Sequence, residues 1–364
     1  MLSAFHHRII NGIFRTCQEG LLLNPEKVTV LLAPAHCQLT GTLYIGTKAF
    51  DFVQPAIGAH QEDSNASGVS TVASSDDSLG DSGAVYVFTR SGSAWTLHSY
   101  IKASTPGAGD LFGSSVSLGG DADTLAVGAH QEDSSANTIG GSETADAADT
   151  DDYGAVYIFS WNGSAWSQQE YIKPANAGKG DEFGFSVSLS DNGNVLAVGA
   201  YLEDGGLDGI DDSGAAYIFT RDSAWTQTAY LKASNADSGD KFGGAVSLSG
   251  DGSLLAVGTK FEESSATGIN GDKIDNSVSQ SGAVFTFAND AGAWGEQAYV
   301  KASNTGLNEN FGSALSINHD GTTLAISAEG EGSNATNIGG NLAHDCNIFP
   351  KVNCLTRSGA VYLY

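Results

Sequence analysis

A unit of about sixty residues recurs along this chain, and it constrains the fold more than any single residue does. Four copies open with a Phe-Gly pair and reach a small residue at a fixed spacing, and parts of a fifth copy precede them. The pairs are Phe112-Gly113, Phe183-Gly184, Phe242-Gly243 and Phe311-Gly312, and the later positions are Gly128, Gly199, Gly258 and Ser327. A unit of short strands cannot bury both of its faces alone, whereas stacked copies can.

Each copy predicts four short antiparallel strands, as the copy that opens at Phe183 illustrates. Residues 186–189 alternate between polar and apolar types, and residues 191–193, Asp-Asn-Gly, supply the positive φ angles of a tight hairpin turn. Residues 196–200 are apolar throughout, which is typical of a strand covered on both faces. A third strand follows Ser213-Gly214, and a fourth runs from Trp225.

Four antiparallel strands in each repeat predict an all-β fold, a β-propeller of about five four-stranded blades. A linear β-solenoid is the alternative, but its rungs are shorter and pair in parallel. We assign residues 51–364 to the propeller and residues 1–50 to a segment outside the repeat. The first copy lacks its Phe-Gly strand and the last stops before its Trp/Tyr strand, so the copies form either a small ring or part of a larger one. Residues 42–45 or 50–53 could complete the last blade.

The ends of the fourth strands carry aromatic residues and a lysine. We expect the Trp and Tyr side chains to pack between neighbouring sheets. We expect the lysines to mark the solvent-facing end of the strand and to discourage edge pairing. These lysines are Lys102, Lys173, Lys232 and Lys301.

The Phe-Gly opening, the Gly-Ala end of the second strand and the Ser-Gly-Ala-Val-Tyr third strand resemble the FG-GAP repeat, the unit of the integrin α-subunit propeller. The resemblance covers roughly residues 57–364 and implies a propeller that binds ligands, in adhesion for example, in a secreted or cell-surface protein. It is specific for fold and not for function. One departure is that His60, His130 or Tyr201 follows Gly-Ala, where the integrin form has proline.

The formal net charge of −26 restricts the partners. So acidic a surface repels nucleic acid and anionic lipid headgroups, and it suits cations. No apolar run is long enough to span a membrane. We therefore expect a protein or glycan ligand on the acidic loops that join the second and third strands, the variable part of a rigid scaffold.

The same loops suggest calcium as a cofactor, because Ca²⁺ prefers several hard oxygen ligands. The candidate ligands are Asp76, Asp77, Asp149, Asp151, Asp152, Asp208, Asp211 and Asp212. No loop follows the EF-hand pattern. The alternative is that these are solvated loops whose Glu-Asp start caps a turn through bonds from the side chain to the backbone.

The first fifty residues resemble part of a trypsin-like serine protease. By that resemblance Ile9 would be the activated N-terminus, His36 the general base, and Cys17–Cys37 the adjoining disulfide. A working protease also needs an aspartate and a nucleophilic serine. Residues 80–83, Gly-Asp-Ser-Gly, imitate the serine motif, but other copies repeat Ser-Gly at that position, so Ser82 is expected to start a strand.

The preferred hypothesis is a non-enzymatic, extracellular adhesion or ligand-binding propeller. The alternative is a remnant of a trypsin-like protease, or an incompletely specified one, with the propeller as an accessory module. A purely structural propeller is a third possibility. A second short-loop disulfide, Cys346–Cys354, fits an oxidising compartment.

Overall fold

The computed structural model describes residues 22–24, 27–29, 55–141, 151–204, 209–333 and 357–364. All regular elements in these ranges are β-strands, which confirms the all-β prediction. Five sheets follow one another along the chain, and we number them blade 1 to blade 5. A separate antiparallel pair, β1 (Leu22–Asn24) and β2 (Lys27–Thr29), precedes them.

Blades 2, 3 and 4 each contain four strands in simple up-and-down order. Blade 2 consists of β7 (Ser115–Leu118), β8 (Thr124–Ala129), β9 (Ala155–Trp161) and β10 (Trp166–Ile172). Blade 3 consists of β11 (Ser186–Leu189), β12 (Val195–Ala200), β13 (Ala215–Arg221) and β14 (Trp225–Leu231). Blade 4 consists of β15 (Ala245–Leu248), β16 (Leu254–Thr259), β17 (Ala283–Asp290) and β18 (Ala293–Val300).

Blades 1 and 5 differ from this plan at the places that the sequence indicates. Among the described residues, blade 1 shows no Phe-Gly strand and consists of β3 (Ala56–Ala59), β5 (Ala84–Ser91), β6 (Ala94–Ile101) and, outside β6, the short β4 (Val69–Ser70). Blade 5 consists of three described strands, β19 (Phe311–Ile317), β20 (Leu324–Ala328) and β21 (Ala360–Leu363). The two segments predicted to complete it lie outside the described residues.

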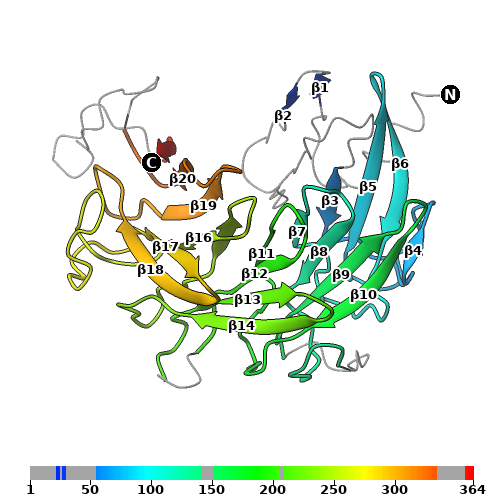
Figure 1. Ribbon diagram of the computed structural model, residues 1–364, viewed down its shortest axis with the longest axis horizontal. Coiled ribbons are helices and arrows are strands. Elements are labelled where there is room, and N and C mark those ends of the chain that lie inside the picture. Colours follow the sequence, from blue (N-terminus) through cyan, green and yellow to red (C-terminus); the bar gives the residue numbers. More distant parts are fainter. Residues whose placement is uncertain (1–21, 25–26, 30–54, 142–150, 205–208, 334–356) are drawn as a thin grey trace.

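The blades succeed one another around a common centre (Figure 1). The inner strands β7 and β11 lie near the middle of the view, and the outer strands β10, β14 and β18 lie toward the rim. Each inner strand packs on the next along the series β3, β7, β11, β15 and β19. The described strands show no comparable packing of β19 on β3, so the series of contacts runs from blade 1 to blade 5.

The hydrophobic core is divided into layers between neighbouring blades. Val85 and Ile101 of blade 1 share one buried cluster with Phe112 and Tyr157 of blade 2. The phenylalanine of each Phe-Gly pair is fully buried, and its ring packs edge-on against a tyrosine or phenylalanine of the third strand. Trp166 and Trp225 are also buried, as expected for packing between sheets, whereas Trp95 and Trp294 are only half-buried.

A close backbone contact explains the glycine at the end of each second strand. A Cβ atom on Gly258 would lie 2.2 Å from the carbonyl oxygen of Gly312 in the next blade. The same contact holds for Gly128 against Gly184 and for Gly199 against Gly243. Because no side chain fits there, each glycine is required by the blade that follows it. Ser327 occupies this position in blade 5, where its hydroxyl bonds the amide of Ala314 in its own blade.

Three of the four lysines that end the fourth strands are buried and Lys232 is half-buried, so the prediction that they face solvent is wrong. Lys301 is 0% exposed, and its ammonium lies 2.7 Å from Glu262 and 2.6 Å from the hydroxyl of Ser281. Tyr299 donates to the same carboxylate. A buried charge needs such a partner, and here the loop before the third strand supplies it. The corresponding pairs are Glu62–Lys102, Glu132–Lys173 and Glu203–Lys232.

Candidate functional site

Two sets of loops emerge at the same end of the blades, which we call the loop face. One set joins the second and third strands of a blade, and the other joins the fourth strand to the next blade. The antiparallel order of the strands brings both sets to this end and sends the hairpin turns to the other. In blades 1 to 3 an aspartate follows the glutamate that pairs with the lysine, and it ties the loop together: Asp63 accepts from the amide of Asp81, and Asp204 from that of Asp212. These bonds agree with the predicted turn-capping role.

Non-glycine residues with positive φ angles recur in pairs where one blade meets the next. Glu182 has φ 53° and donates its amide to the carbonyl of Asp152, whose φ is 45°. Lys241 has φ 60° and forms the same bond with Asp212, whose φ is 52°. Asp81 with Leu111 and Gln280 with Asn310 repeat the arrangement. Such conformations are costly for residues with a Cβ, and they often accompany binding sites.

Side chains at these junctions and next to them contact one another in a row across blades 2, 3 and 4. We define the central row as His130, Glu182, Phe185, Tyr201, Lys241 and Phe261. Glu182 lies 3.6 Å from the imidazole of His130. The rings of Phe185 and Tyr201 are 4.0 Å apart, and the ammonium of Lys241 lies 5.3 Å from the Tyr201 ring and 5.4 Å from the Phe261 ring.

Burial changes the charges of this row. It lowers the pKa of His130 to about 4, and it raises the pKa of Glu182 to about 7 although the Tyr201 hydroxyl donates to that carboxylate. His130 is therefore neutral at pH 7, and Glu182 titrates near that pH. The row combines aromatic faces, one lysine and an adjustable carboxylate, which suits contact with a polypeptide more than with a single ion.

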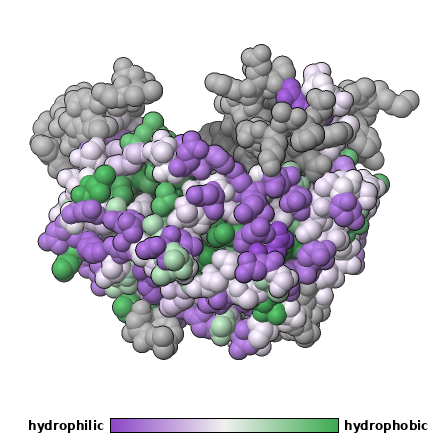
Figure 2. All heavy atoms as spheres, in the orientation of Figure 1, coloured by the Kyte–Doolittle hydropathy of each residue, from purple (hydrophilic) through white to green (hydrophobic). Residues whose placement is uncertain are grey.

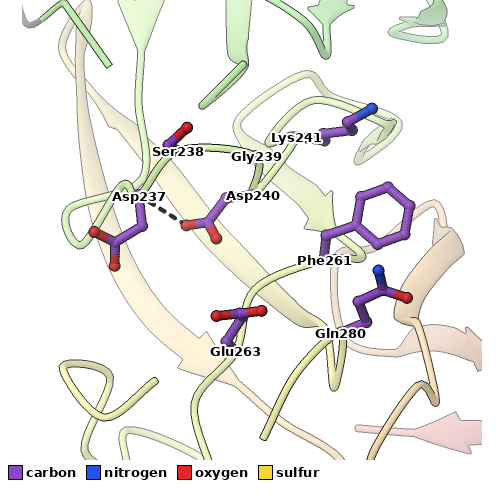
Figure 3. Close-up of a pocket in the computed structure, with 8 residues that line it drawn as sticks. All are labelled: Asp237, Ser238, Gly239, Asp240, Lys241, Phe261, Glu263 and Gln280. Carbon is purple, nitrogen blue, oxygen red and sulfur yellow. Dashed lines mark hydrogen bonds between the residues drawn. The ribbon is translucent and has the colours of Figure 1, made fainter. Parts of the chain in front are cut away.

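A pocket of about 390 Å³ opens at the Lys241 end of the row. It is lined by Asp237, Ser238, Gly239, Asp240, Lys241, Phe261, Glu263 and Gln280, from the loop between blades 3 and 4 and from blade 4 (Figure 3). The carboxylates of Asp240 and Glu263 lie on one side, and Phe261 and Lys241 on the other. Such a wall suits a ligand group that is cationic at its tip and apolar along its stem.

The carboxylates of the pocket are held in place by neighbours. Asp240 accepts from the amide of Asp237 at 3.0 Å, and Glu263 accepts from the hydroxyl of Ser279 at 2.8 Å. Burial raises the pKa of Asp240 to about 7. A cation bound beside it would lower that pKa, so the pocket gains negative charge as it binds.

The predicted calcium ligands do not meet in the described structure. They lie in three separate loops, where Asp151 pairs with Lys179 at 2.6 Å and Asp76 accepts from the amide of Asn65 at 3.2 Å. Asp212 donates its amide to Asp204 at 2.8 Å. Residues 149 and 208 lie outside the described ranges. Within those ranges no three His, Cys, Asp or Glu side chains group as ligands, and calcium binding stays a prediction.

Ser82 belongs to the framework of blade 1, as its repeat position predicts. Its side chain is fully buried and donates to the carbonyl of Ser64 at 2.8 Å, and Lys102 donates to it at 2.7 Å. This position differs from that of an exposed nucleophile. The other residues of the protease resemblance, Ile9 and His36, lie outside the described residues. So do Cys17, Cys37, Cys346 and Cys354, and nothing tests the two disulfides.

In the sequence, His130 and Tyr201 stand out only as departures from a family pattern. Nothing in the sequence connects them with Glu182 or Lys241, because a residue before Phe-Gly shows no sign in sequence that its φ is positive. One feature of the sequence could have indicated the central row. The residue before each Phe-Gly pair is bulky and changes type from copy to copy, whereas the pair itself does not change.

The fold and the loop face define the class of this protein as a five-bladed β-propeller with a rigid, repeated framework and variable loops. The family model described as FG-GAP repeat matches residues 166–219 and 225–287, so these segments are similar to FG-GAP repeats, which agrees with the resemblance seen in the sequence. The matches include the fourth strand of blade 2, most of blade 3 and the first three strands of blade 4. The comparison with curated proteins found no match. In the described part of the chain, no helix has the length and apolar character to cross a bilayer.

Proposed function

We propose that this propeller is a non-enzymatic binding module that acts outside the cell and recognises a basic segment of a protein partner on its loop face. The observation that carries the proposal is the pocket formed by Asp240, Glu263 and Phe261 at the end of the central row. FG-GAP propellers bind protein ligands in general, and the net charge of −26 favours a cationic one.

In this proposal the pocket binds one anchoring side chain of the partner, and the central row contacts the partner residues next to it. A lysine or arginine would place its charge between the two carboxylates and its methylene groups against Phe261. The aromatic pair of Phe185 and Tyr201 provides further contact area, of the kind on which protein recognition depends.

The test is to pan a random peptide display library against the protein at about pH 8, where Asp240 is ionised. We expect selected peptides to contain Lys or Arg, and their affinity to fall at least about tenfold for the double variant Asp240→Asn/Glu263→Gln. The matched control is Asp251→Asn/Asp290→Asn, which removes equal charge at the opposite end of blade 4. Peptides without basic residues, or an equal loss in the control, would contradict the proposal.

A further inference from the structure

The hairpin that joins β9 to β10 carries a sequence motif for a covalent modification. Asn162, Gly163 and Ser164 form an Asn-x-Ser triplet, the acceptor signal for N-linked glycans in secreted proteins. The chain contains two more such triplets, at Asn65 and Asn334. The first of these lies on the loop after β3, and the second lies outside the described residues. Because a triplet alone is a weak signal, its structural setting decides whether it is a site.

The tip of the β9–β10 hairpin is open to solvent. Asn162 and Ser164 are exposed, and a Cβ atom on Gly163 would meet no atom within 4 Å beyond its chain neighbours. Figure 2 shows mostly hydrophilic and neutral residues on the side where Figure 1 places β9 and β10. A bulky, hydrophilic group attached at this tip therefore has room and meets a polar surface.

Hydrogen bonds hold the asparagine in the tip through one side-chain atom. Oδ1 of Asn162 accepts from the hydroxyl of Ser164 at 2.8 Å, and from the amides of Ser164 and Ala165, each at 3.0 Å. These bonds form a turn of the kind that asparagine favours. None of the described residues forms a hydrogen bond with Nδ2, the atom to which an N-linked glycan is attached. A bond from Nδ2 to a sugar therefore leaves the tip as it is.

Blade 1 repeats this tip without the asparagine. Residues 91–95 read Ser-Gly-Ser-Ala-Trp, and residues 162–166 read Asn-Gly-Ser-Ala-Trp. Both tips join the third and fourth strands of their blades, and in each the tryptophan pairs with the residue before the tip. The fold of a blade therefore does not require asparagine at this place. What the asparagine adds in blade 2 is an acceptor amide beside an unchanged Gly-Ser.

We propose that Asn162 carries an N-linked oligosaccharide, attached by an oligosaccharyltransferase of the secretory route. The inference rests on the extracellular location that the proposed function assigns to the protein. The tip lies at the hairpin end of blade 2, opposite the loop face. A glycan at this end leaves the central row and the pocket open to a partner.

The donor for this transfer is an oligosaccharide bound to a lipid diphosphate. Nδ2 of Asn162 forms a bond to C1 of the first sugar, and the bond between C1 and the phosphate oxygen breaks. The lipid diphosphate leaves with the electron pair of that bond. One proton of the amide passes to a carboxylate of the transferase and then to water. The products are a glycosylated asparagine and a free lipid diphosphate, so no oxidant or reductant is needed.

The test is to express the full chain behind a secretory signal peptide in insect cells and to map its peptides by mass spectrometry. We expect the peptide that contains residue 162 to carry a glycan. Occupancy should fall at least about tenfold in Ser164→Ala, which keeps the asparagine and removes the hydroxyl of the signal. Ser93→Ala is the matched control at the tip of blade 1 and should leave this occupancy unchanged. The site is assigned from the intact glycopeptide, because exposed Asn-Gly pairs also deamidate spontaneously.

Two results would overturn the proposal: an unmodified asparagine at residue 162 in the parent chain, or a glycan on it that persists in Ser164→Ala. If the cells retain the chain, the same peptide is read from their membrane fraction, because the transfer takes place before export. Peptide binding to the loop face is measured on protein made in bacteria, which carries no such glycan. Failure of this inference is therefore distinguishable from failure of the proposed function.

Discussion

At the scale of single residues, the most constrained positions are those where two backbones come close. The glycine that ends each second strand faces the carbonyl of the next Phe-Gly pair at less than contact distance for a Cβ. Such a position tolerates no side chain unless a blade moves, because backbone atoms cannot rotate away as a flexible side chain can.

Gly258→Ala should therefore destabilise the protein by about 2–3 kcal/mol, measured by urea denaturation. The control is Gly295→Ala in the same blade, where the nearest atom to the added methyl group is 4.0 Å away. That change should be neutral or slightly stabilising. Equal effects of the two substitutions would show that the contact between blades 4 and 5 is not limiting.

At the scale of elements, each complete blade is held by a charged network that joins the end of its fourth strand to the loop after its second. In blade 4 the members are Glu262, Lys301, Ser281 and Tyr299. Burial lowers the pKa of Lys301, and Glu262 offsets part of that change. Removing one partner is costly because it leaves the other charge buried.

Lys301→Met should cost about 3–5 kcal/mol of unfolding free energy, whereas Glu262→Gln/Lys301→Met should cost markedly less. The control pair, Lys273 and Glu296, is partly exposed, so Lys273→Met should cost within about 1 kcal/mol. Urea denaturation of Lys301→Met, Glu262→Gln and the double variant, each compared with the parent, gives the coupling between Glu262 and Lys301, and Lys273→Met is measured beside them. A double variant as unstable as the single one would show that the pair acts through packing instead of charge.

At the scale of the whole molecule, a buried carboxyl group recurs in the loops that join one blade to the next. Burial raises the pKa of Asp181 to about 6, and the pKa of Asp240 and of Glu309 to about 7. Each group binds protons more tightly in the folded than in the unfolded chain. The contribution of these groups to the free energy of unfolding is fully present below about pH 4 and is lost as the pH rises through about 7.

The contribution of Asp240 can be isolated with Asp240→Asn. The difference in unfolding free energy between the parent and this variant should shift by about 1–3 kcal/mol against the parent between about pH 5 and about pH 8. Hydrogen bonds lower the pKa of Asp251, so Asp251→Asn should give a difference that stays constant over this range. A constant difference for Asp240→Asn would show that its carboxyl group titrates as if exposed.

Most of the fold was predictable because the same pattern of strands and turns recurs in each copy of the repeat. The hairpin of residues 186–200 and its turn follow directly from the alternation and from Asp-Asn-Gly. The burial of Lys301 was not predictable, because a lysine at a strand end looks the same whether it meets solvent or a glutamate from a distant loop. The central row also needed the structure, since the contact of His130 in blade 2 with Glu182 before blade 3 depends on backbone angles that sequence patterns do not encode.

The glycine contact between blades also bears on how an array like this one can lengthen. In this contact, each blade requires a glycine near the end of the second strand of the blade before it. A copy inserted between two existing blades would therefore follow a blade that already has this glycine. A copy with a Phe-Gly strand placed behind blade 5 would meet the side chain of Ser327 instead. Growth by duplication is therefore easy within the array, and at this end it requires a prior change of Ser327 to glycine.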